Sequence, residues 1–574
     1  MAFLNSSLSV QNKSLVNVNG GWAICALSIS ALILLPIVSV IFMALFPANN
    51  IWPHLISTTL PRYISSTVLL MISVGTIAGV IGTLTAWFVV RYRFIGSSWL
   101  QWALLMPLAI PGYVGAYALV DLLEYAGPVQ SALRGVFGWS SARDYWFPEI
   151  RSFGAAVFVL SLSLYPYVYL LTRAAFRDQT SSVEEVARSL GALSSQRFFK
   201  INLPLARPAI AAGVAIVMME TVNDFGTVDY FAVQTLTTGI FSVWLQSNNV
   251  GGAAQLACVV LTMVILLVSF EKLSRRKMQF FNMSSKHKAV QKISLRGFSN
   301  ISAFLFCLAP VLLGFALPLI ILLEHSMSNP HLFMESGLID ALLNTVFIGT
   351  IAAIVTVILS IFMVFGMKSI KGRLPKLTMP VTTIGYAVPG AVLGVGILIP
   401  LAILDNALAD VIYYLTQIDV GLIFTGTSFA IILAYIVRFF AIGQGATEAA
   451  LGRISPNLEH AARSLGKNRA SILKRIYLPI IKGSLGSAML LIFVDCVKEL
   501  PATLLLRPFN FNTLSTRVHE QASLEDLVNA APAAIYISLV GLCAVVLLAR
   551  ANSCLLYTSP SPRDQRGSRM PSSA

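Results

Sequence analysis

Four acidic residues stand inside or at the ends of otherwise apolar segments. Glu220 and Asp224 are spaced i, i+4, and so are Asp495 and Glu499, which follow them 275 residues later. In a helix this spacing places both carboxylates of a pair on one face. Ionisable side chains within an apolar membrane span are costly and usually functional, and carboxylate oxygens suit hard cations. The four acids therefore predict a cation path. Helix-end residues in the water interface are the alternative.

The residues around these acids indicate that the helices break there. From Pro204 to Asp224 is 20 residues, about 30 Å if fully helical, which reaches the far end of a span. Asn223, Gly226 and Pro501 favour unwound backbone, as in transporters whose broken helices line the pathway. The six cysteines form no CxxC pair and histidine is scarce. We therefore expect transient contact with a passing cation and no resident metal site.

The elements that would position these acids are membrane-spanning helices. Of the 574 residues, 56% are hydrophobic and 11% are charged, against roughly 25% charged in an ordinary soluble domain. Apolar segments of about 20 residues recur along the chain, each long enough to cross a bilayer as a helix. The predicted fold class is an all-α integral membrane protein with two homologous six-span halves and about twelve transmembrane helices. The predicted spans are 22–46, 65–90, 100–122, 153–172, 207–223, 252–270, 301–323, 343–366, 378–404, 424–440, 482–497 and 532–549.

The formal net charge of +15 has its explanation in the loops between the spans. Lys and Arg gather after every second span, whereas loops 223–251, 324–342 and 405–423 contain none. Loops 123–152 and 498–531 contain three basic residues each and fit the alternation less well, but both are long, and long loops obey the rule weakly. By the positive-inside rule the basic loops and both termini are cytoplasmic. Basic and aromatic residues do not interleave on a soluble face, so we expect no nucleic-acid partner.

Composition also divides the chain. The expected parts are a polar N-terminal segment (1–21), a first half (22–270), a basic cytoplasmic linker (271–298), a second half (299–552) and a tail (553–574). The tail is rich in Ser, Pro and Arg and resembles a non-native adaptor sequence, so we leave it out of the fold. A native disordered tail is the alternative.

An internal repeat lies in the long basic loop of each half. The string ARSLG occupies 187–191 and 462–466, again 275 residues apart. In the first copy, a helix-forming segment that begins with acidic residues precedes the glycine. The glycine permits a turn, and a second short helix is expected after it. A helix–Gly–helix element that is apolar on one face suits docking into the groove of a partner. A loop packed only on its own bundle is the alternative, which the duplication disfavours.

This loop resembles the EAA motif of ABC importer permeases, E-A-A-x3-G-x9-I-x-L-P. The second copy has His460 where the family has Glu, with Glu459 beside it. The resemblance implies a binding-protein-dependent importer permease with two fused halves, whose two loops dock on a separate ATPase subunit. The residues so implied are Glu184, Glu185, Ala187, Arg188, Gly191, Ile201, Leu203 and Pro204, and then Glu459, Ala462, Arg463, Gly466, Ile476, Leu478 and Pro479.

The resemblance also implies function and location. The chain would be a multi-pass protein of a bacterial inner membrane, fed by a periplasmic or extracellular binding protein and driven by an ATPase homodimer. No G-x-x-x-x-G-K-[ST] loop occurs, so we expect a transport subunit that is no enzyme and binds no cofactor, with ATP used by the partner. Segments 219–231 and 497–509 resemble those of iron(III) importer permeases. A thiamine permease is the alternative substrate class, and a secondary transporter is a more distant one.

Overall fold

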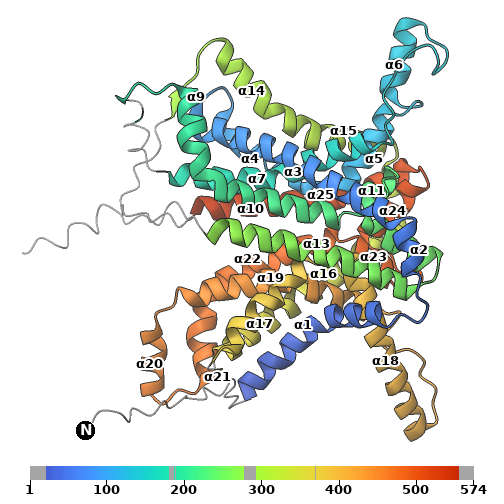
Figure 1. Ribbon diagram of the computed structural model, residues 1–574, viewed down its shortest axis with the longest axis vertical. Helices are drawn as coiled ribbons and strands as arrows, with labels where there is room; N and C mark the ends of the chain where they lie inside the picture. Colours follow the sequence, from blue (N-terminus) through green and yellow to red (C-terminus); the bar gives the residue numbers. More distant parts are fainter. Residues whose placement is uncertain are drawn as a thin grey trace, which may run out of the picture.

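The computed structural model describes residues 21–179, 187, 189–276, 292–368, 370 and 372–554. Within these residues the chain is helical almost throughout, which confirms the predicted all-α membrane fold (Figure 1). Eleven helical segments of the described chain are long and apolar enough to cross a membrane, and a bent pair makes a twelfth.

The helices follow one another in the same order in both halves. The first half contains α1 (Gly21–Leu45), α2 (Trp52–Ser57), α3 (Leu60–Arg91), α4 (Ser97–Ala103), the 3-10 helix η1 (Met106–Ala109), α5 (Gly112–Leu123), α6 (Pro128–Phe137), α7 (Phe153–Asp178), α9 (Ser194–Arg197), the π-helix η2 (Phe198–Asn202), α10 (Leu203–Asn223), α11 (Gly226–Tyr230), α12 (Leu236–Phe241), the π-helix η3 (Ser242–Gln246) and α13 (Val250–Arg276).

The second half contains α14 (Phe298–Val311), the π-helix η4 (Leu312–Ala316), α15 (Leu317–Ser328), the 3-10 helix η5 (Pro330–Met334), α16 (Ser336–Met367), α17 (Leu374–Thr382), the 3-10 helix η6 (Thr383–Ala387), α18 (Gly390–Thr416), α19 (Ser428–Gly452), α20 (Pro456–Ser464), α21 (Arg469–Ile472), the π-helix η7 (Leu473–Tyr477), α22 (Leu478–Lys498), α23 (Pro501–Leu506), α24 (Leu514–Ser523) and α25 (Leu527–Cys554). Strands β1 (Tyr92–Arg93) and β2 (Ile293–Ser294) pair in parallel and tie the end of the linker to the loop after α3.

The third predicted span of each half, 100–122 and 378–404, is not continuous. In the first half, Ser97–Ala109 and Gly112–Phe137 meet at 90°. In the second half, α17 and η6 end before Pro389, and α18 begins at Gly390. Pro111 and Pro389 both have extended backbone, with ψ of 147° and 143°. Proline removes a helical hydrogen bond and clashes with the preceding turn, so each Pro-Gly pair ends one helix and starts another. The other ten predicted spans coincide with long helices.

The first span of each half packs against the other half. Trp22 of α1 stacks on Phe362 of α16, with ring centroids 5.8 Å apart. In the opposite direction, Phe306 of α14 lies 5.6 Å from Phe88 of α3. Figure 1 shows α1 beside α16 and α18, and α14 beside α3 and α4. The predicted boundaries at 22–270 and 299–552 therefore divide the sequence without separating two independent packing units. Segment 1–20, most of the linker (277–291) and the tail from 555 lie outside the described residues.

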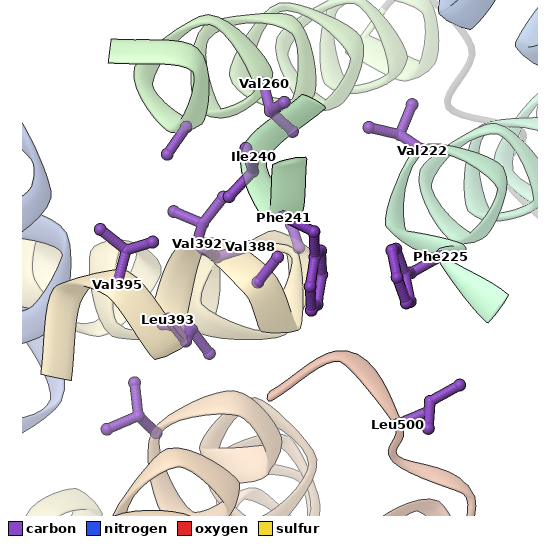
Figure 2. Close-up of a cluster of buried hydrophobic side chains, with 14 of the residues drawn as sticks. Val222, Phe225, Ile240, Phe241, Val260, Val388, Val392, Leu393, Val395 and Leu500 are labelled. Atoms are coloured by element: carbon purple, nitrogen blue, oxygen red, sulfur yellow. The ribbon is translucent and has the colours of Figure 1, made fainter. Parts of the chain in front are cut away.

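The two halves meet at a buried apolar cluster (Figure 2). Phe225 and Phe241 of the first half stack with ring centroids 3.8 Å apart, close to Val388 of the second half. Leu500 belongs to the same cluster and approaches from the second half. In Figure 1 the elements after α10 and α22 lie at the end of the bundle opposite α9 and α20. The cluster therefore seals the interface at that end.

Candidate functional site

All four predicted acids line one cavity between the halves. The cavity has a volume of about 170 Å³, room for several water molecules. Helix α10 ends at Asn223 and α22 ends at Lys498, so the breaks fall where the sequence predicts them. Glu220 and Asp224 approach from one half, and Asp495 and Glu499 approach from the other. The acids do stand near helix ends, but inside the bundle.

Asp224 is held by neutral donors. Its Oδ1 accepts from the backbone N–H groups of Thr227 (3.0 Å) and Val228 (3.1 Å), and its Oδ2 accepts from the Thr227 hydroxyl at 2.9 Å. These groups belong to the first turn of α11, where orphan N–H groups and the helix dipole favour a carboxylate. Asp224 therefore stays oriented without a cationic partner.

Glu499 is held by a cation. Arg438 Nη1 lies 3.1 Å from Glu499 Oε1, and the backbone N–H of Ala502 donates to the same oxygen at 3.1 Å. The two side chains are only 9% and 4% exposed. Removing one member of such a buried pair would leave the other charge uncompensated, at a cost of about 3–5 kcal/mol.

The Pro-Gly pairs stand directly against these carboxylates. A Cβ atom on Gly112 would lie 2.9 Å from Thr227 Oγ1 and 3.7 Å from Asp224 Oδ2. A Cβ atom on Gly390 would collide with Glu499 Oε1 and Arg438 Nη1. The glycines thus let the broken third span approach the acid of its own half, which explains the repeat of this dipeptide.

A shared polar frame supports both acids. Thr67 Oγ1 accepts from Leu236 N at 3.0 Å, and Thr345 Oγ1 accepts from Leu514 N at 2.8 Å. The Thr237 hydroxyl donates to the Asp224 carbonyl (2.9 Å), and the Ser515 hydroxyl donates to the Glu499 carbonyl (2.8 Å). The two halves are therefore built alike around positions 224 and 499.

Sequence reasoning missed several polar residues of the cavity. Arg438 is the main one, and a lone arginine inside the apolar helix α19 is a signal that could have found it. Tyr386 OH lies 3.4 Å from Glu220 Oε1, and Tyr167 lines the same wall. Lys498 was not missed, because the sequence makes it a possible partner of the acids, but its Nζ donates to the Leu108 carbonyl at 2.6 Å. No sequence pattern marks the two tyrosines, because many tyrosines occur in spans.

The second duplicated loop forms the predicted helix–Gly–helix element. Helix α20 is followed by Gly466, whose φ of +71° favours glycine, and then by α21 and η7. The Tyr477 hydroxyl donates to Glu459 Oε2 at 2.6 Å, and Arg463 pairs with the other oxygen. Although partial burial opposes it, these two partners hold the pKa of Glu459 below its ordinary value. Glu459 therefore links α20 to the π-helix that leads into the next span, through its contact with Tyr477. His460, which stands at the Glu position of the motif, is exposed.

The other predicted residues of this loop lie along the same element. Ala462 is buried, Ile476 lies within η7, and Leu478 and Pro479 open α22. In the first loop, Gly191 has a φ of +79°, Ala187 is buried, Ile201 lies in η2, and Leu203 and Pro204 open α10. Glu184, Glu185 and Arg188 lie outside the described residues.

The described residues contain no group of three His, Cys, Asp or Glu side chains that could hold a metal ion. The four acids therefore do not form a closed cage in this structure. Spaced carboxylates on both walls can instead replace some of the water ligands of a cation that keeps the rest of its water shell.

Known proteins resemble this chain over both halves. A Fe(3+)-transport system permease protein (FbpB 2) of Haemophilus influenzae is 27% identical over 489 residues, covering 84% of this chain and 89% of that protein. A ferric transport system permease protein of Actinobacillus pleuropneumoniae is 24% identical over 473 residues, covering 78% and 64%. A sulfate transport system permease protein (CysT) of Escherichia coli is 30% identical over 195 residues, covering 33% and 67%.

The family of binding-protein-dependent transport system inner membrane components matches this chain twice, at residues 78–280 and 357–552. Each match takes in one ARSLG loop and one pair of cavity acids, so the repeat seen in the sequence is a repeat of the family unit. The chain belongs to this family, as a multi-pass transport subunit in which two permease units are fused.

Proposed function

We propose that this chain is the membrane path of an ABC importer that moves ferric iron into the cytoplasm. The observation that carries the proposal is that Glu220, Asp224, Asp495 and Glu499 line one and the same cavity between the halves. Relatives named for ferric or Fe(3+) transport align over both halves, whereas the sulfate-transport relative aligns over a third of the chain. Carboxylate oxygens are suitable ligands for a hard cation of high charge.

The path would work by successive, weak contacts. An iron ion delivered at the sealed end by an external binding protein would pass the Phe225–Phe241 seal when that end opens. The carboxylates would then replace part of its water shell, which lowers the cost of taking a charge into the bundle. A set of spaced acids releases the ion more readily than a closed cage, and a permease must release its cargo.

Two ATPase subunits would dock on the two duplicated loops. Leu190 and Leu465 occupy equivalent positions just before Gly191 and Gly466 and are 81% and 77% exposed. Exposed leucines on a short helix beside a fixed turn suit insertion into a groove. The sequence has no phosphate-binding loop of its own, so ATP hydrolysis would belong to the partner. The loops, and both termini, would then face the cytoplasm.

The test is transport by the purified importer in proteoliposomes. The chain is reconstituted with its ATPase inside the vesicles and iron-loaded binding protein outside, and uptake of radioactive Fe³⁺ is compared with uptake of radioactive thiamine. We expect ATP-dependent iron uptake that requires the binding protein. Thiamine uptake without iron uptake would overturn the substrate. Uptake of either solute without the ATPase would overturn the importer itself.

A further inference from the structure

Four basic side chains meet at the end of the first half that carries its duplicated loop, although they come from three separate parts of the chain. Arg93 belongs to β1, Arg173 and Arg177 lie in the last two turns of α7, and Lys292 directly precedes β2. The strands β1 and β2 pair in parallel, and the backbone N–H of Leu295 donates to the Arg93 carbonyl at 3.0 Å, which brings Lys292 next to Arg93. Partial burial, followed by the positive charges of the other three residues, lowers the pKa of Lys292. We call these four residues the basic cluster.

The charge of the basic cluster is not offset by acids of the described residues. Those acids that form ion pairs within 4.0 Å do so with other basic side chains. The Arg173 guanidinium donates to the Gln101 side-chain oxygen at 2.9 Å and lies 4.7 Å from the centroid of the Trp102 ring. Both partners are neutral, so they leave the charge of Arg173 uncompensated although the residue is only 5% exposed. Because like charges repel one another, an anion bound among the four would be stabilising.

The second half does not repeat the basic cluster. At the repeat offset of 275, Arg173 corresponds to Glu448 and Arg177 to Gly452. Glu448 accepts a hydrogen bond from the Gln444 side chain at 2.6 Å, so an acid with its own donor stands where the first half has a buried guanidinium. The positive-inside rule acts on the loops of both halves. It does not account for basic side chains that gather at one point in one half only.

An apolar surface borders the basic cluster. Ile95 and Trp99 are exposed beside β1, and Phe298 and Ile301 are exposed on α14. The Ile95 backbone N–H donates to the side chain of Asn300 at 2.8 Å, so the two exposed pairs lie on adjoining elements. Figure 1 shows α14 at the edge of the bundle, near α4 and α9. Large apolar side chains at the edge of a membrane bundle face lipid, and tryptophan at the end of a span marks the headgroup level.

We propose that the basic cluster binds the phosphate headgroup of an anionic phospholipid whose acyl chains lie along α4 and α14. Arginine and lysine supply charge-assisted donors to phosphate oxygens, and basic pockets between spans on the cytoplasmic side bind such headgroups. An acidic protein surface would match the charges but not the apolar side chains beside them, which favours a lipid. The bound headgroup holds the end of the linker on the first half, because Arg93 and Lys292 flank the strand pair. This inference does not depend on which solute is transported.

The test is retention of cardiolipin by the purified full chain. Each protein is placed in phosphatidylcholine nanodiscs that contain a small fraction of cardiolipin and is then transferred to detergent, and the bound lipid is counted by native mass spectrometry. The variant is Arg93→Gln with Lys292→Gln, which leaves the buried contacts of Arg173 intact. Arg93→Lys with Lys292→Arg keeps the charge. Lys376→Gln with Lys482→Gln is the matched control, because it removes the same charge from exposed lysines of the second half.

We expect wild type to retain cardiolipin in preference to phosphatidylcholine, and the Gln variant to retain at least about tenfold less, because two of the four charges are removed. The charge-keeping variant and the second-half control should match wild type. Retention by the Gln variant equal to that of the control would overturn the inference. Inorganic phosphate that displaces cardiolipin more than NaCl of the same ionic strength would assign the cluster to a free anion. Reduced co-purification of the ATPase with the Gln variant, at unchanged cardiolipin retention, would assign the cluster to that protein and likewise overturn the lipid site.

Discussion

Asp224 and Glu499 occupy equivalent positions at the broken ends of α10 and α22, but only Glu499 is paired with an arginine. Asp224 accepts its hydrogen bonds from Thr227 and Val228, whereas Glu499 Oε1 lies 3.1 Å from Arg438 Nη1. The internal repeat therefore duplicates the position of the acid but not its electrostatic partner. A fused chain can differentiate its halves in this way, because each half mutates independently of the other.

The glycines of the two Pro-Gly pairs should differ in how much substitution costs. Gly390→Ala places a Cβ against the buried ion pair, and Gly112→Ala places one 2.9 Å from Thr227 Oγ1. Overpacking typically costs about 1–3 kcal/mol, and we expect Gly390→Ala to lower the melting temperature more because the ion pair has less room to move. Gly135→Ala, where nothing lies within 4 Å, is the control. Equal melting temperatures for all three would contradict the close approach.

The turns at Gly191 and Gly466 should be required for coupling and not for insertion. Their φ values are +79° and +71°, and a Cβ at either would meet no atom within 4 Å, so the penalty of substitution is in the backbone. Valine in this conformation costs roughly 1–2 kcal/mol. In the double Val variant we expect normal membrane insertion with reduced co-purification of the ATPase and reduced iron uptake. Gly452→Val, in a helix and with open space around it, should behave as wild type.

The contact that holds α20 should depend on pH. The pKa of Glu459 is held below its ordinary value, so its contribution to loop stability is present above about pH 4.3, the ordinary Glu pKa, and is lost as pH falls through the lower folded value. Hydrogen exchange of α20, corrected for intrinsic rates, should therefore accelerate at acid pH in the wild type. In Glu459→Gln it should be fast at neutral pH and should change little with pH. A wild-type acid response retained in Glu459→Gln would exclude this contact as its cause, and His460→Gln serves as the control.

The orientation of the chain can be read with an impermeant thiol reagent. In a background without the six native cysteines, Asn406→Cys on α18 should be labelled in intact cells, because 405–423 has no basic residue. Asn457→Cys, exposed on α20, should be labelled only after permeabilisation. Labelling of Asn457→Cys in intact cells would place the duplicated loops outside and would be incompatible with an ATPase docked on them.

The sequence contains enough to predict the spans, the repeat and the four acids, because each depends on local composition or on a fixed offset. The breaks at Pro111 and Pro389 could also be predicted from the sequence, since proline inside an apolar run marks a break in a helix. The packing of α1 on the second half could not be predicted, because Trp22 and Phe362 lie far apart in the chain and meet only in the folded structure.

The polar partners of the acids divide in the same way. Arg438 can be recognised in the sequence as a candidate functional residue, because it is a lone arginine within an apolar span. Tyr386 does not, because the position of its hydroxyl near Glu220 depends on how η6 turns before Pro389. Local patterns thus locate charges, whereas the pairing of those charges across the cavity depends on tertiary packing.

The most direct test of the account is iron uptake by the double variant Glu220→Gln with Asp224→Asn. Both changes remove charge from the first-half wall and leave the Arg438–Glu499 pair intact. The matched control is Glu324→Gln with Asp410→Asn, two exposed acids outside the cavity. In proteoliposomes with bound ATPase, we expect radioactive Fe³⁺ uptake to fall at least about tenfold, equivalent to about 1.4 kcal/mol of barrier, while the control stays at the wild-type rate. Uptake by the cavity variant at the wild-type rate would contradict a carboxylate path for the ion.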